Sequence, residues 1–521
     1  MDFNKSYRSE RTPVFAENVV ASSQPLATQA GIKILQNGGN AVDAALAAAI
    51  VLTVVEPTGN GLGSDAVVIL ADDEQIIAIN GTGHSPSGWT EERFINSKAM
   101  PLFGWDSVTV PGAVKLWWRL SEQYGRISFP ELFKNAISYA QNGFFVGNKV
   151  ALEWKHYYGI VGNANDAFRQ EFSPVPKIGD WLKREKMSYT LEEIASTGFS
   201  SFYEGEIAST IVRQSSTEGG VITPDDLADY EPNVVEPIKI CFRDVEIAEL
   251  PPNTQGLYAL VALGILNYLP IAELDSTDFF HYQIEAMKLS LKICHNLIAD
   301  PNFYEFDFGD AFDEEVFINY ASSISNTAKP LSCNLTDKSQ DTVYLATADA
   351  SGLMVSFIQS NYLGFGSGVV IKEKGIALHN RGAGFSLNSK HPNIVGPRKK
   401  PFHTIIPGIV LESGRPLMAF GMMGGPMQPQ GHVQLLDRII THKLNPQSAC
   451  DAPRWQVIEE GKVIVESSFP KRTVEELSNR GHDIGFEKNE ILFGGAQVIQ
   501  KIQGGFVAGS DPRKDGCAAG F

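Results

Sequence analysis

The pattern of hydrophobic residues along the chain changes near residue 325. Before it, apolar residues often recur at spacings of three and four, as in residues 276–300 (STDFFHYQIEAMKLSLKICHNLIAD), which is typical of amphipathic helices. After it, short runs rich in β-branched and apolar residues are separated by glycine-containing turns, which is typical of strands. Between them, residues 325–340 (SNTAKPLSCNLTDKSQ) are polar and include Pro330, so they predict an exposed linker.

The first half also contains one segment that is apolar on nearly every face, residues 44–55 (AALAAAIVLTVV). Asn40 is a suitable N-cap and Pro57 a suitable stop, so the segment predicts a helix buried between other layers. It is too short to span a bilayer. A second helix is predicted over residues 24–39, ending on two glycines, and residues 66–81 predict two short strands joined at Asp72-Asp73.

The second half predicts mainly strands. Residues 342–349 and 353–362 form a hairpin pattern joined by Ala-Ser-Gly, and three further segments have strand pattern: 368–380, 403–420 and 496–511. Helical pattern is concentrated in residues 430–443 and 472–481. A sheet begun by the helix-rich half and completed by the strand-rich half would give layers of helix, sheet, sheet and helix.

Composition narrows the class of protein. The 521 residues allow one to three domains with a sizeable core. The net charge of −17, with no basic cluster longer than residues 397–401, argues against a nucleic-acid partner or an anionic membrane. Five cysteines without a CxxC pair predict reduced thiols in a cytoplasmic protein, and residues 1–15 lack the apolar run of a signal peptide.

The usual ligand motifs do not occur. The glycine runs at 59–65 and 364–368 lack the GxxxxGK[ST] pattern of a phosphate loop, so tight turns near a crowded site are the better interpretation. The ten histidines show no HExxH spacing, and no GxSxG elbow is present. The sequence therefore predicts neither a metal site nor an organic cofactor.

Thr342 is the candidate nucleophile. A threonine hydroxyl needs a base beside it, and the α-amino group of the same threonine can serve once the preceding peptide bond is cut. An α-amine has a pKa of about 7.7–8.0, so a usable fraction is neutral at physiological pH. The alternative is that Thr342 merely begins a strand, and for a threonine taken without its context that alternative is far more common.

The context is a set of motifs that runs along nearly the whole chain. In the first half these motifs are, in order, ASSQPLATQAGIKILQNGGNAVDAALAAAIVLTVVEPTGNGLGSD, VTVPGAV, TPDDLADY and ELPPNTQG. In the second half they are residues 342–368 (TVYLATADASGLMVSFIQSNYLGFGSG), GPRKKPFHTIIPGIV, GMMGGP, DAPRW and SDPRKDGCAAGF. This order resembles the γ-glutamyltranspeptidase family of N-terminal-nucleophile hydrolases. The resemblance implies an α+β fold, a four-layer αββα sandwich. It also implies a helix-rich segment 1–341 and a strand-rich segment 342–521 that share one core.

The resemblance also implies a catalytic apparatus. The precursor would cut itself between Asp341 and Thr342, and Thr342 would then attack the substrate amide while its own α-amine moves the proton. Ser360 stands where the family commonly has threonine, and its hydroxyl can bond the new amine. Gly424 and Gly425 match the glycine pair whose N–H groups form the oxyanion hole.

All three elements by which γ-glutamyl-specific members hold their donor are altered in this sequence. Thr82 stands in place of the arginine that binds the α-carboxylate, and Gly384 in place of the aspartate that binds the α-amine. The paired serines become His403 and Thr404. A zwitterionic donor without charge partners is costly to desolvate, so we expect glutathione to bind poorly.

The same positions suggest a different substrate. His403 and Thr404, together with Tyr362 and Arg381, could suit a smaller or less charged acyl group, and Arg381 could supply a carboxylate contact from a new place.

The sequence therefore predicts a self-processing threonine amidohydrolase that hydrolyses, or transfers, the acyl group of a small amide. It would have no nucleic-acid or membrane partner, and a homo-oligomer stays open. Three alternatives remain: a true γ-glutamyltransferase or glutathione hydrolase with an altered donor site, an acylase of oxamate-type or β-lactam side-chain amides, and an unprocessed binding protein without activity.

Overall fold

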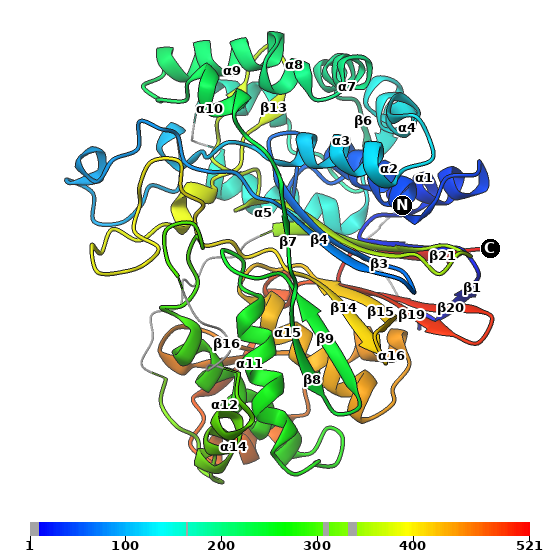
Figure 1. Cartoon of the computed structure of the whole chain (residues 1–521), viewed down its shortest axis with the longest axis vertical. Helices are drawn as coiled ribbons and strands as arrows, with labels where there is room; N and C mark the ends of the chain where they lie inside the picture. Colours follow the sequence, from blue (N-terminus) through cyan, green and yellow to red (C-terminus); the bar gives the residue numbers. More distant parts are fainter. Residues whose placement is uncertain (1–9, 163–164, 306–311, 332–340) are drawn as a thin grey trace.

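Two seven-stranded antiparallel sheets are stacked face to face in the middle of the molecule, and helices cover both outer faces (Figure 1). The computed structural model describes residues 10–162, 165–305, 312–331 and 341–521. In spatial order, the first sheet consists of β21 (Cys517–Gly520), β2 (Val19–Ser22), β10 (Asp341–Ala348), β11 (Met354–Tyr362), β3 (Asp65–Ala71), β4 (Ile76–Gly81) and β7 (Asn233–Val235). The second consists of β1 (Val14–Ala16), β20 (Gly505–Ser510), β19 (Ala496–Ile502), β15 (Arg415–Met422), β14 (Pro407–Glu412), β9 (Val245–Glu249) and β8 (Ile238–Phe242).

The helices form two separate outer layers (Figure 1). On the first sheet lie α1 (Pro25–Gln36), α2 (Ala41–Val55), α3 (Ala113–Tyr124), α4 (Phe129–Asn142), α5 (Asn148–Val161), α6 (Asp166–Phe172), α7 (Glu185–Thr197), α8 (Ser200–Tyr203), α9 (Glu206–Thr217) and α10 (Pro224–Ala228). On the second lie α11 (Gly256–Asn267), α12 (Thr277–Cys294), α14 (Glu314–Ser323), α15 (Met427–Leu436), α16 (Pro446–Asp451) and α17 (Lys471–Asn479). Three smaller sheets pair β5 (Phe144–Phe145) with β6 (Trp181–Leu182), β12 (Val370–Ile371) with β13 (Ile376–Ala377), and β17 (Val463–Glu466) with both β16 (Trp455–Val457) and β18 (Ile484–Glu487).

Each interface between layers has its own apolar core. The two sheets meet through buried side chains such as Tyr344, Ile358, Ile409 and Ile499. Burying apolar surface at roughly 25 cal/mol per Å² is the main favourable contribution to such packing. The α+β fold with αββα layers that the sequence predicts is thus confirmed.

Helix α2 shows why an all-apolar helix is stable here. Its N-cap Asn40 accepts the Asp43 N–H, and the Asp43 carboxylate accepts the Asn40 N–H, which completes a capping box. Every residue from Ala41 to Val55 is buried. The helix ends at Val55, and Glu56, which follows it, is carried into the interior close to the site described below.

Strands from both sides of the Asp341–Thr342 bond are interleaved in both sheets. β10, which begins with Asp341, lies between β2 and β11 in the interior of the first sheet. The predicted hairpin is present as β10 and β11, and the predicted pair over residues 66–81 as β3 and β4.

The outcome differs for three other segments. Residues 368–380 contain only the two-residue strands β12 and β13, because the chain turns within Lys372–Gly375 instead of extending. In the predicted linker, residues 325–330 are largely exposed, whereas residues 332–340 lie outside the described part of the chain, as do residues 1–9.

Among the helices that the structure describes, none is long and apolar enough to cross a bilayer.

Candidate active site

Thr342 lies at the start of β10, where the pairing with β11 is irregular. Asp341 pairs with Tyr362 and Val343 with Gln359, so the register shifts across Thr342. Thr342 alone therefore faces two residues of β11, Ser360 and Asn361, and the extra residue of the irregularity belongs to β11. The backbone of Thr342 also lies against Gly59, where an added Cβ would be 3.1 Å from the Thr342 nitrogen, so the glycine run at 59–65 provides space next to the nucleophile.

The carbonyl oxygen of Asp341 accepts hydrogen bonds from two hydroxyl groups. This carbonyl belongs to the peptide bond that is predicted to be cut. Thr342 Oγ1 donates to this oxygen at 2.7 Å and Ser360 Oγ at 3.0 Å, and the two hydroxyl oxygens lie 3.0 Å apart. Ser360 Oγ in turn accepts the Tyr362 N–H at 2.9 Å. All of these groups are buried. The predicted nucleophile and its predicted hydroxyl partner therefore meet at the carbonyl that would be attacked.

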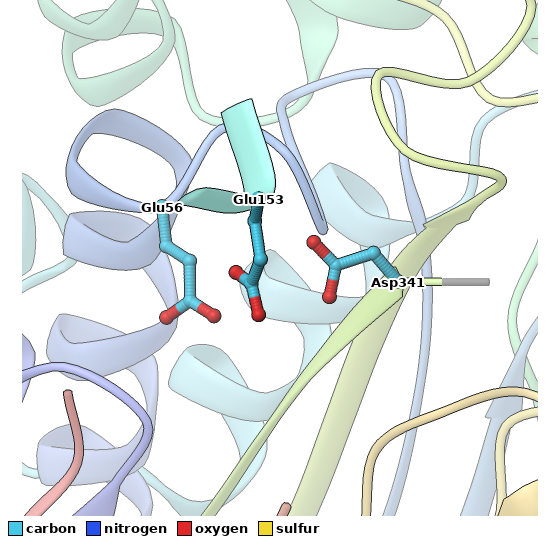
Figure 2. A group of neighbouring side chains, drawn as sticks. All are labelled: Glu56, Glu153 and Asp341. Atoms are coloured by element: carbon cyan, nitrogen blue, oxygen red, sulfur yellow. The ribbon is translucent and has the colours of Figure 1, made fainter. Parts of the chain in front are cut away.

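On the other side of the same bond lies a cluster of three buried carboxylates from three different elements: Glu56 after α2, Glu153 in α5 and Asp341 at the start of β10. Figure 2 shows their carboxylate groups facing one another. The spacing of their oxygens could suit a metal ion. Lys514 Nζ reaches all three, at 3.1 Å from Asp341, 3.7 Å from Glu56 and 2.5 Å from Glu153. Its ammonium group thus supplies a positive charge to this cluster.

The protonation of this cluster is shifted by burial. Burial raises the pKa of Glu56 and Glu153 above the ordinary range of a carboxyl group, although Lys514 opposes the shift. Burial alone would lower the pKa of Lys514, but attraction by the carboxylates, that of Asp341 foremost, raises it well above its ordinary value. Lys514 therefore remains an ammonium group at any physiological pH.

The loop between β15 and α15 carries Gly424 and Gly425. Both residues have positive φ angles, 108° and 56°, in the region that glycine occupies with the least strain. Within the described part of the chain, neither N–H donates to another protein group. The Gly425 carbonyl accepts Gln255 Nε2, which also donates to the Thr404 carbonyl, so this loop is fixed to the segment that follows β9.

A cavity of about 220 Å³ opens between this loop and β11. Tyr362, Gly384, Gln255 and Pro426, the residue after Gly425, are all part of its wall. The remaining wall is formed by Tyr258, Leu291, His295, Ile298, Ala383, Phe385, Ser386, His391, Asn393, Phe402 and Gln430. This wall contains no aspartate, glutamate, lysine or arginine, and burial lowers the pKa of both its histidines.

A buried polar network is centred on Asp65. His403 Nε2 lies 3.1 Å from Asp65 Oδ2, and His379 Nε2 lies 3.6 Å from Oδ1. Burial raises the pKa of Asp65 to about 7, against the attraction of Arg381, whereas burial lowers the pKa of both histidines, that of His379 to about 3. Both histidines are therefore neutral at pH 7.

Arg381 lies at the edge of this network and is itself fully buried. Its Nη1 donates to Thr404 Oγ1 at 2.7 Å, and its Cζ lies 4.9 Å from the centre of the Tyr362 ring. Nε and Nη2 have no hydrogen-bond partner among the described residues. Burial lowers the pKa of Arg381 to about 9, so the side chain is still charged at neutral pH.

The predicted substrate-binding residues thus fall into two groups. Tyr362 and Gly384 are part of the cavity wall. Thr82, Arg381, His403 and Thr404 are not among the residues that line it. Thr82 Oγ1, for example, donates to Asn80 Oδ1 at 2.7 Å and lies 3.3 Å from the amide of Asn253. The structure therefore places Thr82 in a hydrogen-bond network rather than in the wall.

Sequence reasoning missed four residues of these networks: Asp65, Glu56, Glu153 and Lys514. Asp65 closes the glycine run at 59–65, Glu56 follows an apolar helix directly, and Lys514 lies in the C-terminal motif, so each stood beside a recognised signal. Glu153 lies in α5 without any signal, because nothing in one sequence indicates which polar residue of a helix faces the interior.

Gly425→Val should lower kcat by about 10²–10³, because a β-branched residue would move the N–H that we expect to bind the developing oxyanion, while KM changes less. Steady-state kinetics measure the effect. Gly414→Val is the matched control: Gly414 also has a positive φ, 79°, but lies in the β14–β15 turn with open space around its Cβ. An equal loss in both variants would remove Gly425 from the site.

Comparison with known proteins agrees with this geometry. The family model described as gamma-glutamyltranspeptidase matches residues 27–521. The chain is 34% identical to the glutathione hydrolase-like YwrD proenzyme of Bacillus subtilis, over 98% of this chain and 100% of the relative. It is 31% identical to the oxamate amidohydrolase proenzyme of Klebsiella pneumoniae, over 98% and 99%.

Solved structures give the same result. The crystal structure of cephalosporin acylase from Bacillus halodurans superimposes with a TM-score of 0.95 at 40% identity, covering 100% of this chain and 99% of that one. The relatives are hydrolase and acylase proenzymes, and this chain is an enzyme of the same kind. The chain belongs to the gamma-glutamyltranspeptidase family of N-terminal-nucleophile hydrolases.

Proposed function

We propose that this protein is a self-processing amidohydrolase that removes the acyl group of a small amide through an acyl-enzyme on Thr342. The observation that carries the proposal is the pair of hydroxyl groups, Thr342 Oγ1 and Ser360 Oγ, that both donate to the Asp341 carbonyl. A hydroxyl held against the carbonyl of its own preceding residue is in place for an N-to-O acyl shift.

The chemistry runs in two stages. In the first, Thr342 Oγ attacks the Asp341 carbonyl carbon, the C–N bond breaks, and the hydroxyl proton ends on the Thr342 nitrogen; water then cleaves the ester and restores the hydroxyl. In the second, the freed α-amine takes the Thr342 hydroxyl proton as Oγ attacks a substrate amide, and it returns that proton to the leaving amine. The N–H groups of Gly424 and Gly425 would hold the oxyanion.

The cavity wall supports an uncharged acyl group. A γ-glutamyl donor carries an α-carboxylate and an α-ammonium, and the wall offers neither an acid nor a base to pair them. Leaving a charge unpaired in an enclosed site costs several kcal/mol. Amide side chains such as Gln255 and Asn393, with aromatic rings around them, suit neutral polar and apolar groups instead.

An acyl group that ends in a carboxylate is a second candidate, favoured by Arg381. Its Nε and Nη2 have no partner in the described chain, and a buried guanidinium with free donors suits a carboxylate. The relatives described as oxamate amidohydrolase and cephalosporin acylase leave an oxamate-type or β-lactam side-chain substrate open. Transfer to an acceptor, a role in glutathione metabolism, a cytoplasmic location and a homo-oligomer remain predictions.

A panel of amides tests the proposal. Purified processed protein should hydrolyse at least one amide among simple acyl, oxamoyl and γ-glutamyl compounds, and Thr342→Ala should hydrolyse none. A neutral acyl amide as the best substrate supports the neutral cavity, and an oxamoyl amide supports a contact with Arg381. A wild-type chain that stays whole near 56.9 kDa and hydrolyses nothing would instead support the alternative of a binding protein without activity.

A further inference from the structure

Lys514 stands out because it is a buried charge outside the predicted catalytic residues. It lies in the loop between β20 and β21 with a side chain only 6% exposed. A buried ammonium group is costly unless it is paired, and Lys514 is surrounded by Asp341, Glu153 and Glu56. A fold that needed only stability could fill this space with apolar side chains, so the pairing calls for a functional explanation.

The contact with Asp341 connects Lys514 to the bond that is cut. Asp341 Oδ1 accepts the Lys514 ammonium at 3.1 Å, and the same oxygen accepts the N–H of Thr342 at 2.9 Å. That N–H belongs to the nitrogen that must leave when the bond breaks. One carboxylate oxygen therefore joins the ammonium group to the leaving nitrogen.

The two glutamates hold Lys514 from the opposite side. Glu153 Oε1 is its second hydrogen-bond acceptor, and Glu56, 3.7 Å away, is itself fixed by Ser23 Oγ at 2.6 Å. Glu56 directly follows α2 and Glu153 lies in α5, whereas Asp341 begins β10. Figure 2 shows the three side chains close together. Lys514 thus ties the start of β10 to two helices of the outer layer.

We propose that Lys514 is a positioning residue for self-cleavage, holding the Asp341 carboxylate against the Thr342 N–H so that the Asp341 carbonyl faces the Thr342 and Ser360 hydroxyl groups. The inference rests on the proposed self-processing. During the acyl shift the Thr342 nitrogen takes the hydroxyl proton in the tetrahedral intermediate, before its bond to the Asp341 carbon breaks, so positive charge develops on it transiently, and cleavage of the bond leaves a neutral amine. A carboxylate that already accepts its N–H stabilises that charge, and Lys514 holds the carboxylate in this orientation.

The other charged groups near Lys514 determine how cleavage responds to pH. Besides the three carboxylates, Asp515 next to it in the chain acts on Glu56, and His156 on α5 lies near enough to interact with Asp341. Lys514 lowers the pKa of Glu56 and Glu153, so without the ammonium group these two glutamates would hold their protons to a higher pH. The acid side of the cleavage profile should then move to higher pH.

The test compares three variants as purified, uncleaved precursors. Lys514→Met should slow the conversion into two chains by about 100-fold or more and shift the acid limb of the rate–pH profile upward. Lys514→Arg, which keeps the charge, should cleave within about 10-fold of wild type. Lys288→Met is the matched control, because Lys288 is also buried and is paired with Glu285 at 3.0 Å, but on α12 in the opposite helical layer.

A merely structural role predicts a different pattern. The single variant Lys514→Met leaves the carboxylates without their cation. The double variant Lys514→Met, Glu153→Gln removes one of these carboxylates, so it should regain thermal stability but not the cleavage rate. Recovery of cleavage together with stability, or an unshifted pH profile in Lys514→Met, would overturn the proposal. The proposal would also be overturned if Lys514→Met cleaved at the wild-type rate while processed wild type hydrolysed amides. That outcome would leave the proposed function intact.

Discussion

Incubation of the purified wild-type chain should produce two fragments, with the smaller beginning TVYLA, and Thr342→Ala should abolish both the cleavage and amide hydrolysis, lowering kcat/KM by about 10⁴-fold or more. The physical reason is that one hydroxyl performs both reactions in the proposed mechanism, and Thr342 Oγ1 is held 2.7 Å from the carbonyl oxygen of Asp341. N-terminal sequencing of the fragment and a denaturing gel measure the first effect, and steady-state kinetics the second.

Thr347→Ala is the control for this variant. Thr347 lies on the same strand, is equally buried, and donates its Oγ1 proton to the Ala41 carbonyl at 2.6 Å, far from the bond that is cut. It should cleave normally after some loss of stability. A wild-type protein that stays whole yet hydrolyses amides at full rate would show that the α-amine of Thr342 is not the base.

Glutathione and γ-glutamyl-anilides should be poor substrates, two to four decades lower in kcat/KM than the best amide of the panel. Unpaired charges in an enclosed pocket cost on the order of 3–5 kcal/mol. The structure adds a steric argument at Gly384, where an added Cβ would lie 2.5 Å from the Phe402 carbonyl oxygen. An aspartate for the donor amine would therefore not fit at this position without a backbone shift.

Steady-state kinetics with a γ-glutamyl-anilide measure this expectation. The simple acyl amide, assayed on the same preparation, controls for the amount of active enzyme. A kcat/KM of about 10⁴ M⁻¹s⁻¹ or above for the anilide would show that the altered pocket still reads the glutamyl group, with Arg381 as the residue to examine for the carboxylate contact.

The fold was largely predictable because its signals are local or belong to whole motifs. The capped helix after Asn40 and the hairpin of β10 and β11 follow from caps, periodicity and turn residues. The order of strands within each sheet, which interleaves segments hundreds of residues apart, could not be derived from periodicity. The four layers were predicted from the helix-rich and strand-rich halves of the chain together with the family resemblance.

The site was predictable only in part. Thr342 and Ser360 were found because they stand at fixed places in motifs, and the structure brings their hydroxyl groups together. Lys514 and Glu153 were missed because their meeting depends on a contact between residues 361 positions apart. Thr82 is predicted to bind substrate from its motif position; it is not among the residues that line the cavity, and its hydroxyl group bonds Asn80 and Asn253.

The most direct test of the central claim is the mass of the 342–521 chain during turnover. Processed enzyme is mixed with the best amide of the panel, or with an activated ester of the same acid, and quenched in acid. The account predicts that the chain gains the mass of the acyl group and that peptide analysis places it on Thr342. An acyl group on another residue, or undiminished hydrolysis by Thr342→Ala protein, would contradict it.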